Sequence, residues 1–348
     1  MSNAPKKNDI LEFSGDQLRS WLADRKIAAY RADQIQKWIY LRQADSFDVM
    51  TDLSREIREL LSQYFAICRL EAEQIETSRD GSRKYLFRLK DGKHIESVFI
   101  PEKDHDTLCV SSQVGCAQGC LFCLTAADGF ERNLSRGEII AQIRDIKKGL
   151  DDPSRLRNIV FMGMGEPLAN YKNLVSAINT ITDSDNGLGF ASRRVTVSTA
   201  GLATKLVALG RDTRVNLAIS LNATDNKTRS QLMPINRKYP LEKLLEACRK
   251  FPLAPSRRIT FEYILINGVN DSEQDAKRLA TLLRPIRAKI NLIPFNPHAG
   301  CDFERPAEVV INKFQDFLIS KNYTVMIRQS KGQDISAACW QLRARRKS

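Results

Sequence analysis

Hydrophobic residues along the first 65 positions recur at intervals of three or four, which is the spacing of an amphipathic helix. Trp21 and Trp38 both fall on such apolar stripes. The segments with this periodicity are residues 16–27, 32–42 and 54–65. We therefore expect residues 1–75 to form a small helical accessory domain.

The pattern changes to alternation over residues 84–89 and 95–100, which is typical of half-buried β-strands. Between them stands Lys90-Asp91-Gly92-Lys93. Asp-Gly favours a tight hairpin turn, because such turns need residues that tolerate a positive φ. A hairpin over residues 76–104 is predicted to connect the helical domain to the core.

From about residue 107 onward, short β-branched runs alternate with longer amphipathic ones. The predicted strands are residues 107–112, 158–162, 194–198, 215–221, 259–264, 290–293 and 324–327. The predicted helices are residues 136–149, 174–181, 203–209, 241–250, 272–283 and 306–320. This alternation indicates an α/β fold with parallel strands, either a full or partial β/α barrel over residues 105–335 or a doubly wound sheet. Residues 336–348 follow it as a C-terminal loop and basic tail.

Polar and glycine-rich segments follow several of these strands. Functional groups gather at the carboxyl ends of parallel strands in both architectures. A cysteine-rich loop follows the first core strand, and Gly163-Met164-Gly165-Glu166-Pro167 follows the second. Further polar loops begin at Ser198, Ser220 and Pro294. The sequence therefore predicts one ligand site at this edge of the sheet.

The cysteine-rich loop holds Cys116, Cys120 and Cys123, a Cys-x3-Cys-x2-Cys run. Three thiolates on one short loop can hold three irons of a [4Fe-4S] cluster and leave the fourth iron open to a ligand that is not protein. A zinc knuckle is an alternative, although zinc sites usually have four ligands in paired spacings and no second Cys/His pair stands nearby. Three unrelated thiols are the remaining alternative.

The composition adds a basic charge to this picture. The chain has 348 residues and a net charge of +13. Residues 1–95 carry 17 Lys and Arg against 15 Asp and Glu, whereas residues 96–348 carry 37 against 26. An RNA substrate fits this surface, because neutralising phosphates releases counterions; a basic surface kept for solubility is the alternative.

The N-terminus lacks the apolar core of a signal peptide, and no apolar run approaches the length of a membrane span. We expect a cytoplasmic protein without membrane contact. Eight clustered cysteines in such a chain indicate metal or redox chemistry more than a disulfide framework.

The cysteine run and residues 163–167 resemble the signatures of radical S-adenosylmethionine (SAM) enzymes. More narrowly, the chain resembles the RlmN/Cfr methyltransferases through Leu-Cys-Val-Ser-Ser-Gln-Val-Gly-Cys at 108–116, Met-Pro-Ile-Asn at 233–236 and Asp-Ile-Ser-Ala-Ala-Cys at 334–339. The resemblance implies a partial (β/α)6-type barrel. Pro167 and residues 125–130 resemble the RlmN branch, which methylates C2 of an adenine in 23S rRNA; Cfr enzymes, which confer antibiotic resistance, methylate C8.

The resemblance implies roles for two cysteines outside the cluster loop. Cys339 matches the cysteine that carries the methyl group, and Cys109 matches its partner. In the family, one SAM methylates the Cys339 thiolate and a second SAM gives the 5′-deoxyadenosyl radical that removes hydrogen from the S-methyl group. The methylene radical adds to C2, an electron returns, and loss of the C2 proton with attack by Cys109 releases the RNA and leaves a Cys109–Cys339 disulfide. Glu96, between apolar neighbours, matches the proton acceptor.

The resemblance also implies a SAM site and partners. The matched SAM-contacting residues are Gly165, Glu166, Ser198, Ser220, Leu221, Asn222 and Asn296. Two positions depart from the family: histidine is common at position 222, and glycine is common where Trp340 stands. The implied partners are 23S rRNA, also tRNA beside the anticodon, and a low-potential flavodoxin- or ferredoxin-like electron donor; we expect a monomer.

Two other classes of function remain at this point. A radical SAM enzyme acting on a protein or small molecule would leave Cys109, Cys339 and the basic core unexplained. A non-catalytic iron–sulfur protein that binds RNA would leave the Gly-rich and polar loops without a purpose.

Overall fold

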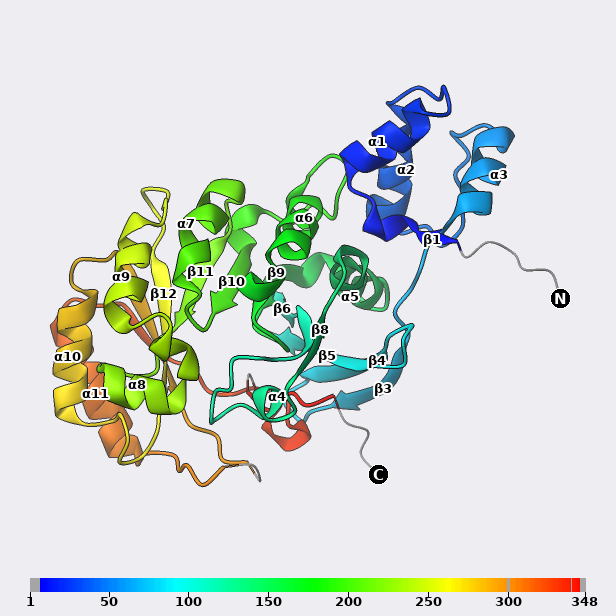
Figure 1. Ribbon diagram of the computed structural model, residues 1–348. Helices are drawn as coiled ribbons and strands as arrows, with labels where there is room; N and C mark the ends of the chain where they lie inside the picture. Colours follow the sequence, from blue (N-terminus) through cyan, green and yellow to red (C-terminus); the bar gives the residue numbers. More distant parts are fainter. Residues whose placement is uncertain (1–6, 299–300, 339, 345–348) are drawn as a thin grey trace.

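The computed structural model describes residues 7–298, 301–338 and 340–344. Its N-terminal domain is helical and lies at one end of the molecule (Figure 1). The helices are α1 (Gly15–Ala23), α2 (Arg31–Gln36), a π-helical turn (Lys37–Leu41) and α3 (Arg55–Tyr64). The short strands β1 (Asn8–Asp9) and β2 (Phe65–Ala66) pair in parallel and close the domain. The three predicted helices are all present in this domain.

A ten-stranded sheet forms the rest of the chain's framework. Its antiparallel strands are β3 (Ala72–Thr77), β4 (Arg83–Arg88) and β5 (His94–Pro101), and β5 also runs antiparallel to β6. Its parallel strands are β6 (Asp106–Cys109), β9 (Leu156–Phe161), β10 (Val195–Thr199), β11 (Asn216–Ser220), β12 (Ile259–Leu265), β13 (Ala288–Pro294) and β14 (Val325–Ile327). Each of the seven predicted core strands overlaps one of these parallel strands.

The order of the parallel strands decides between the two predicted architectures. From β6 to β14 the strands lie side by side in sequence order, with no reversal. Right-handed crossovers then place the helices on one face, so the sheet curves into a partial barrel instead of being doubly wound. These helices are α5 (Arg136–Lys148), α6 (Tyr171–Thr182), α7 (Ala203–Asp212), α8 (Asn226–Leu232), α9 (Leu241–Lys250), α10 (Glu273–Leu283) and α11 (Glu308–Ser320) (Figure 1). Within the described residues, no helix has the length and apolarity to cross a membrane.

Several short elements were not predicted from the sequence, and β3 and α8 are the longest strand and α-helix among them. The predicted β4–β5 hairpin pairs with β6 and so forms part of the main sheet. β3 adds a further strand beside β4 and spans the predicted boundary between residues 75 and 76. β3 was not predicted, because its side chains alternate between exposed and half-buried and it carries no buried apolar face. Helix α8 was also missed; it is short and mostly polar, and Asp225 caps its N-terminus.

The C-terminal segment after β14 returns across the open side of the barrel to the opposite edge of the sheet. The backbone N–H of Gly332 donates to Asp80, in the β3–β4 turn, at 2.9 Å. The ammonium group of Lys84 on β4 donates to the carbonyl of Ile335 at 2.8 Å. The segment that leads to position 339 therefore leaves one edge of the sheet at β14 and is hydrogen-bonded to the opposite edge at β3 and β4.

Candidate active site

The cysteine loop is closed at its base by two short antiparallel strands, β7 (Gln113–Gly115) and β8 (Phe130–Asn133). The backbone N–H of Cys116 donates to the carbonyl of Gly129 at 2.8 Å. Gly115 has a φ of +71°, and a Cβ atom there would lie 1.9 Å from the Gly129 carbonyl oxygen. Only glycine fits this close contact between residues 115 and 129. Gly115 thus allows the two ends of the cysteine loop to pair.

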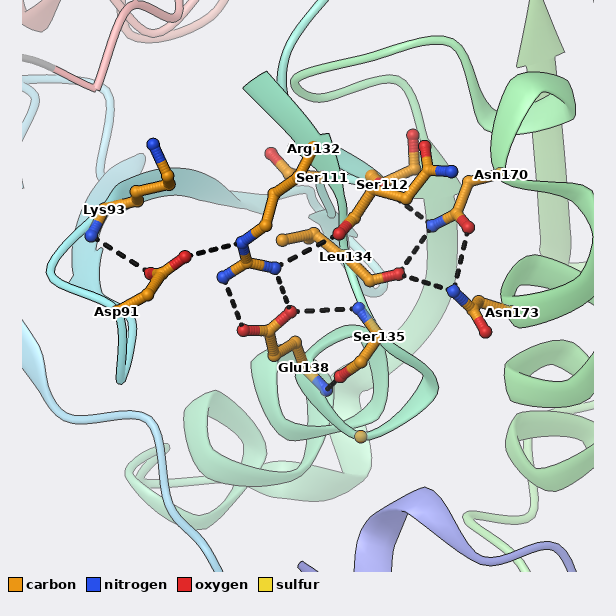
Figure 2. A network of polar contacts seen from close by, with 12 residues as sticks. Asp91, Lys93, Ser111, Ser112, Arg132, Leu134, Ser135, Glu138, Asn170 and Asn173 are labelled. Carbon is orange, nitrogen blue, oxygen red and sulfur yellow. Dashed lines mark hydrogen bonds and ion pairs between the residues drawn. The ribbon is translucent and has the colours of Figure 1, made fainter. Parts of the chain in front are cut away.

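A polar network holds the strand β8 in place (Figure 2). The guanidinium of Arg132 donates to Asp91 in the β4–β5 turn at 2.6 Å and to both carboxylate oxygens of Glu138 at 2.8 and 2.9 Å. Glu138 is also the capping-box partner of Ser135 at the start of α5. The side chain of Asn170 donates to the carbonyls on either side of the loop base, at residues 112 and 134. The cysteine loop thus rests on rigid elements.

The three cysteine side chains line one cavity at the carboxyl ends of the parallel strands. Burial raises the pKa of the Cys116 thiol to about 12, and burial is also the largest cause of the raised pKa values of Cys120 and Cys123. Within the described part of the chain, no three Cys, His, Asp or Glu side chains are arranged around a single metal ion. A cluster differs from a single ion, because each thiolate binds its own iron. Of the three, Cys116 is buried and the other two are half-buried. Thiols that face one cavity and need a positive centre to ionise fit such a cluster.

Glu166 lies in the same cavity, at the end of the Gly-rich segment. Its carboxylate accepts from the backbone N–H of Ala200 at 2.7 Å and from that of Leu168 at 3.0 Å. Burial raises the pKa of Glu166 to about 7, and these two hydrogen bonds oppose that rise. Gly165, at a φ of +95°, would place a Cβ 2.4 Å from Gln113. A ligand with an ammonium group would stabilise the charged form of this carboxylate.

A second carboxylate on the cavity wall was not predicted from the sequence. Glu262, in the middle of β12, accepts a hydrogen bond from Ser198 Oγ at 2.9 Å, and burial raises its pKa. Ser220, at the end of β11, lines the same cavity. A charged residue within the apolar run Ile-Thr-Phe-Glu-Tyr-Ile-Leu is the signal that could have identified this position.

Three of the residues predicted to contact SAM either lie outside the cavity or have a side chain already bonded to the protein. The Asn222 side chain faces the cavity, but its oxygen accepts from the backbone N–H of Ile264 at 2.9 Å. Asn222 also has a φ of +57°, which asparagine tolerates better than most residues. Leu221 is buried beside the cavity without lining it. Asn296 does not line it either, and its carbonyl accepts from the indole N–H of Trp340 at 3.4 Å.

Glu96 is buried on β5 within an ionic network. Its carboxylate accepts from the backbone N–H of Arg343 at 2.9 Å and lies 3.4 Å from the Lys84 ammonium group. Lys84 also pairs with Glu76 at 3.0 Å, directly across the β3–β4 register. Cys109 ends the neighbouring strand β6 and is buried, opposite Val98 of β5. The predicted proton acceptor and methyl-transfer partner therefore stand on adjacent strands; Cys339 lies outside the described residues.

The segment after position 339 is docked on the cysteine loop. The backbone N–H of Leu124, in the short helix α4 (Leu124–Ala127), donates to the carbonyl of Trp340 at 2.9 Å. Thr125 Oγ1 donates to the carbonyl of Leu342 at 2.6 Å. The Trp340 indole is buried on the cavity wall and stacks on Phe295, with ring centroids 5.8 Å apart and planes 6° apart. Trp340 thus anchors this segment beside the cavity in the described conformation.

Comparisons with known proteins agree with this architecture. The model of the radical SAM superfamily matches residues 110–280, and the model of the ribosomal RNA large subunit methyltransferase N-terminal domain matches residues 8–67. A curated protein of Desulfosudis oleivorans, named dual-specificity RNA methyltransferase RlmN, is 57% identical over 99% of this chain and 93% of its own length. A protein of the same name from Geobacter sulfurreducens is 53% identical over 97% of this chain and 92% of its own. The crystal structure of a radical SAM methyltransferase from Sphaerobacter thermophilus matches with a TM-score of 0.90 and 41% identity, covering 97% of this chain and 100% of that one.

Proposed function

This chain belongs to the RlmN family of dual-specificity radical SAM RNA methyltransferases, and we propose that it methylates C2 of an adenine in 23S rRNA. We extend the proposal to an adenosine beside the tRNA anticodon, which the dual specificity of the named relatives supports. Membership of the superfamily implies a [4Fe-4S] cluster and SAM. The single observation that carries the proposal is the cavity that joins the three loop cysteines to Glu166, in a chain related to these enzymes over nearly its whole length.

The residues of the cavity would divide the cofactor binding among them. Cys116, Cys120 and Cys123 would hold the cluster, which with SAM supplies a 5′-deoxyadenosyl radical when bound. Glu166 would accept from the SAM ammonium group, since its carboxylate is buried and already oriented by two backbone donors. The remaining proposed contacts are Gly165, Ser198, Ser220, Leu221, Asn222 and Asn296, of which Gly165, Ser198, Ser220 and Asn222 line the cavity.

Two cysteines of this chain would take part in methyl transfer. Cys339 would carry it, and two SAM molecules would be consumed in each turnover, one as methyl donor and one as radical source. Glu96 would accept the C2 proton, and the Cys109 thiolate would attack the Cys339 sulfur to release the RNA. The burial of Glu96 and Cys109 on adjacent strands supports these roles, because both would act away from bulk water.

The remaining parts of the proposal concern partners and domains. A low-potential flavodoxin- or ferredoxin-like protein would supply the electron, and the enzyme would act as a monomer. Residues 1–75 would serve as the accessory domain, residues 105–335 as the catalytic barrel and residues 336–348 as the thiol-bearing loop. Residues 76–104 would support the barrel through β4 and β5, which belong to its sheet.

The test is anaerobic reconstitution with iron and sulfide, followed by SAM, a reductant and an unmodified 23S rRNA transcript. We expect 2-methyladenosine in the digested RNA, and none from Cys339→Ala. Cys248→Ala, on the buried face of α9, is the matched control and should retain activity. The proposal is wrong if Cys339→Ala still forms 2-methyladenosine, or if 8-methyladenosine is the product.

A further inference from the structure

The partial barrel encloses a lumen below the cluster cavity, and its wall carries both polar and apolar side chains. A β/α barrel interior is usually filled by branched apolar side chains. Here six of the strand residues that line the lumen carry hydroxyls or amides, beside apolar residues such as Ile100 and Val160. The six are Thr107, Asn158, Thr196, Asn216, Thr260 and Asn291. Such a lining offers hydrogen-bond donors and acceptors to a polar guest instead of a packed core.

Cationic side chains surround the outer mouth of this lumen. Arg193 and Arg194 directly precede β10, Lys289 is the second residue of β13, and Arg328 directly follows β14. In the described part of the chain, none of them is within ion-pair distance of a carboxylate. Burial and the guanidinium groups of Arg328 and Arg258 lower the pKa of Lys289. The carboxylates of Glu102 and Glu262 also line the lumen; burial raises the pKa of Glu262, and the charge of Arg328 opposes that rise. The cations outnumber these carboxylates, so the lining has an excess of positive charge.

The inner end of the lumen reaches the proposed reaction site. Met162, Glu262 and Ile293 line both the lumen and the cavity of the cluster cysteines. Cys109 lines the lumen, and so does Ala338, beside position 339. A planar group that enters from the mouth would meet the thiol of Cys109 and the wall shared with the cluster cavity.

We propose that the lumen is the passage by which the substrate RNA inserts its adenine, while Arg193, Arg194, Lys289 and Arg328 hold the flanking phosphates at the mouth. This inference rests on the proposed function. A base extruded from its stack is planar and rich in hydrogen-bonding groups, which suits the amides and hydroxyls of the lumen. The phosphates stay outside, where unpaired cations attract them.

An acidic protein is the competing partner for such a mouth, and the electron donor would be one. Arg193, Arg194 and Lys289 lie at the amino ends of β10 and β13, and the fourth cation, Arg328, follows the carboxyl end of β14. The cysteine loop and the cavity lie at the carboxyl ends of the strands. A donor needs to approach the cluster, and three of the four cations are at the other end of the strands. The position of the charge therefore favours RNA.

The experiment measures binding of the full-length reconstituted protein to an unmodified 23S rRNA transcript over a range of salt concentrations. The variant is Arg193→Gln with Lys289→Gln, because neither side chain makes a hydrogen bond or ion pair within the described residues. We expect the dissociation constant to rise roughly 10-fold at physiological salt, and the slope of log affinity against log salt to become shallower by about 1 to 2. Arg328→Gln alone should shift both quantities in the same direction.

The matched control is Lys243→Gln with Arg249→Gln, which removes the same charge from exposed positions on α9. It should lower RNA affinity much less than the lumen variant does. Equal effects of the two double variants would overturn the inference, and so would an unchanged RNA affinity with slower reduction by a flavodoxin-like donor. Formation of S-methylcysteine at Cys339 in the unmutated protein, without RNA, tests the proposed function separately, so the two failures are distinguishable.

Discussion

Lys84→Met tests the ionic network that joins the proposed proton acceptor to the C-terminal segment. The Lys84 side chain is 8% exposed and contacts Glu96, Glu76 and the carbonyl of Ile335. Methionine keeps the length of the apolar stem and removes the ammonium group. Glu96 is then left buried with the Arg343 backbone N–H still donating to it, and the Ile335 carbonyl loses its lysine partner.

The expected loss follows from the burial of the pair. Removing one partner of a buried ion pair costs about 3–5 kcal/mol, and we expect about 3 kcal/mol here because Glu76 is partly solvated and Glu96 keeps one donor. For a chain of this length, that loss lowers the Tm by roughly 4 °C. The assay is urea and thermal unfolding of the variant, with Lys103→Met, an exposed lysine in the loop between β5 and β6, as the control.

A double-mutant cycle with Glu96→Gln isolates the pair from the rest of the network. We expect a coupling free energy on the order of 1–2 kcal/mol between Lys84 and Glu96, since they are in contact and share the docked segment. A coupling near zero, or a loss in Lys84→Met no larger than in Lys103→Met, would refute the view that this network holds Glu96 and the segment in place.

Four further predictions concern the cysteine loop and the C-terminal segment. Gly115→Ala should prevent normal iron incorporation, measured as iron per chain, because its Cβ would overlap the Gly129 carbonyl. Arg132→Leu should lower the free energy of unfolding by about 2 kcal/mol and reduce iron content, because it removes a bidentate ion pair with Glu138; a variant as stable as the parent would contradict this. Trp340→Gly should make the segment after position 339 more susceptible to proteolysis, because Trp340 is its stacked anchor. Burial raises the pKa of Asp80, but hydrogen bonds from Gly332, Ser82 and Ser78 outweigh it and lower that pKa to about 2. The contribution of Asp80 to docking of the C-terminal segment should therefore persist above pH 4 and fade towards pH 2. Asp80→Asn should remove this pH dependence.

Much of the barrel could be predicted because its strands are short β-branched runs between amphipathic helices. Strand β12 and helix α10, for example, follow the pattern closely, and the Ser272 capping box marks the start of α10. The choice between a partial barrel and a doubly wound sheet needed the strand order, which no local pattern contains. Strand β3 was missed because an exposed edge strand carries little hydrophobic signal.

The candidate site, too, could be predicted only in part from the sequence. The cysteine loop and Glu166 could be identified because they are close in sequence and follow strand ends. The network of Lys84 could not, because its partners come from two neighbouring strands and from Ile335, 251 residues away. Asn222 illustrates a different difficulty, since the residue is present but its side-chain oxygen already accepts from the backbone of β12. The type of a residue shows which contacts its side chain can make. The fold decides which partner it contacts.

The central claim is that Cys339 carries the methyl group to the RNA. Mass spectrometry of the purified, SAM-treated protein tests it directly, through the digested peptide that contains Cys339. We expect one methyl group on that cysteine, and transfer of its carbon, when isotopically labelled, to C2 of adenine on addition of unmodified RNA. An unmethylated Cys339 in protein that forms 2-methyladenosine would contradict the account.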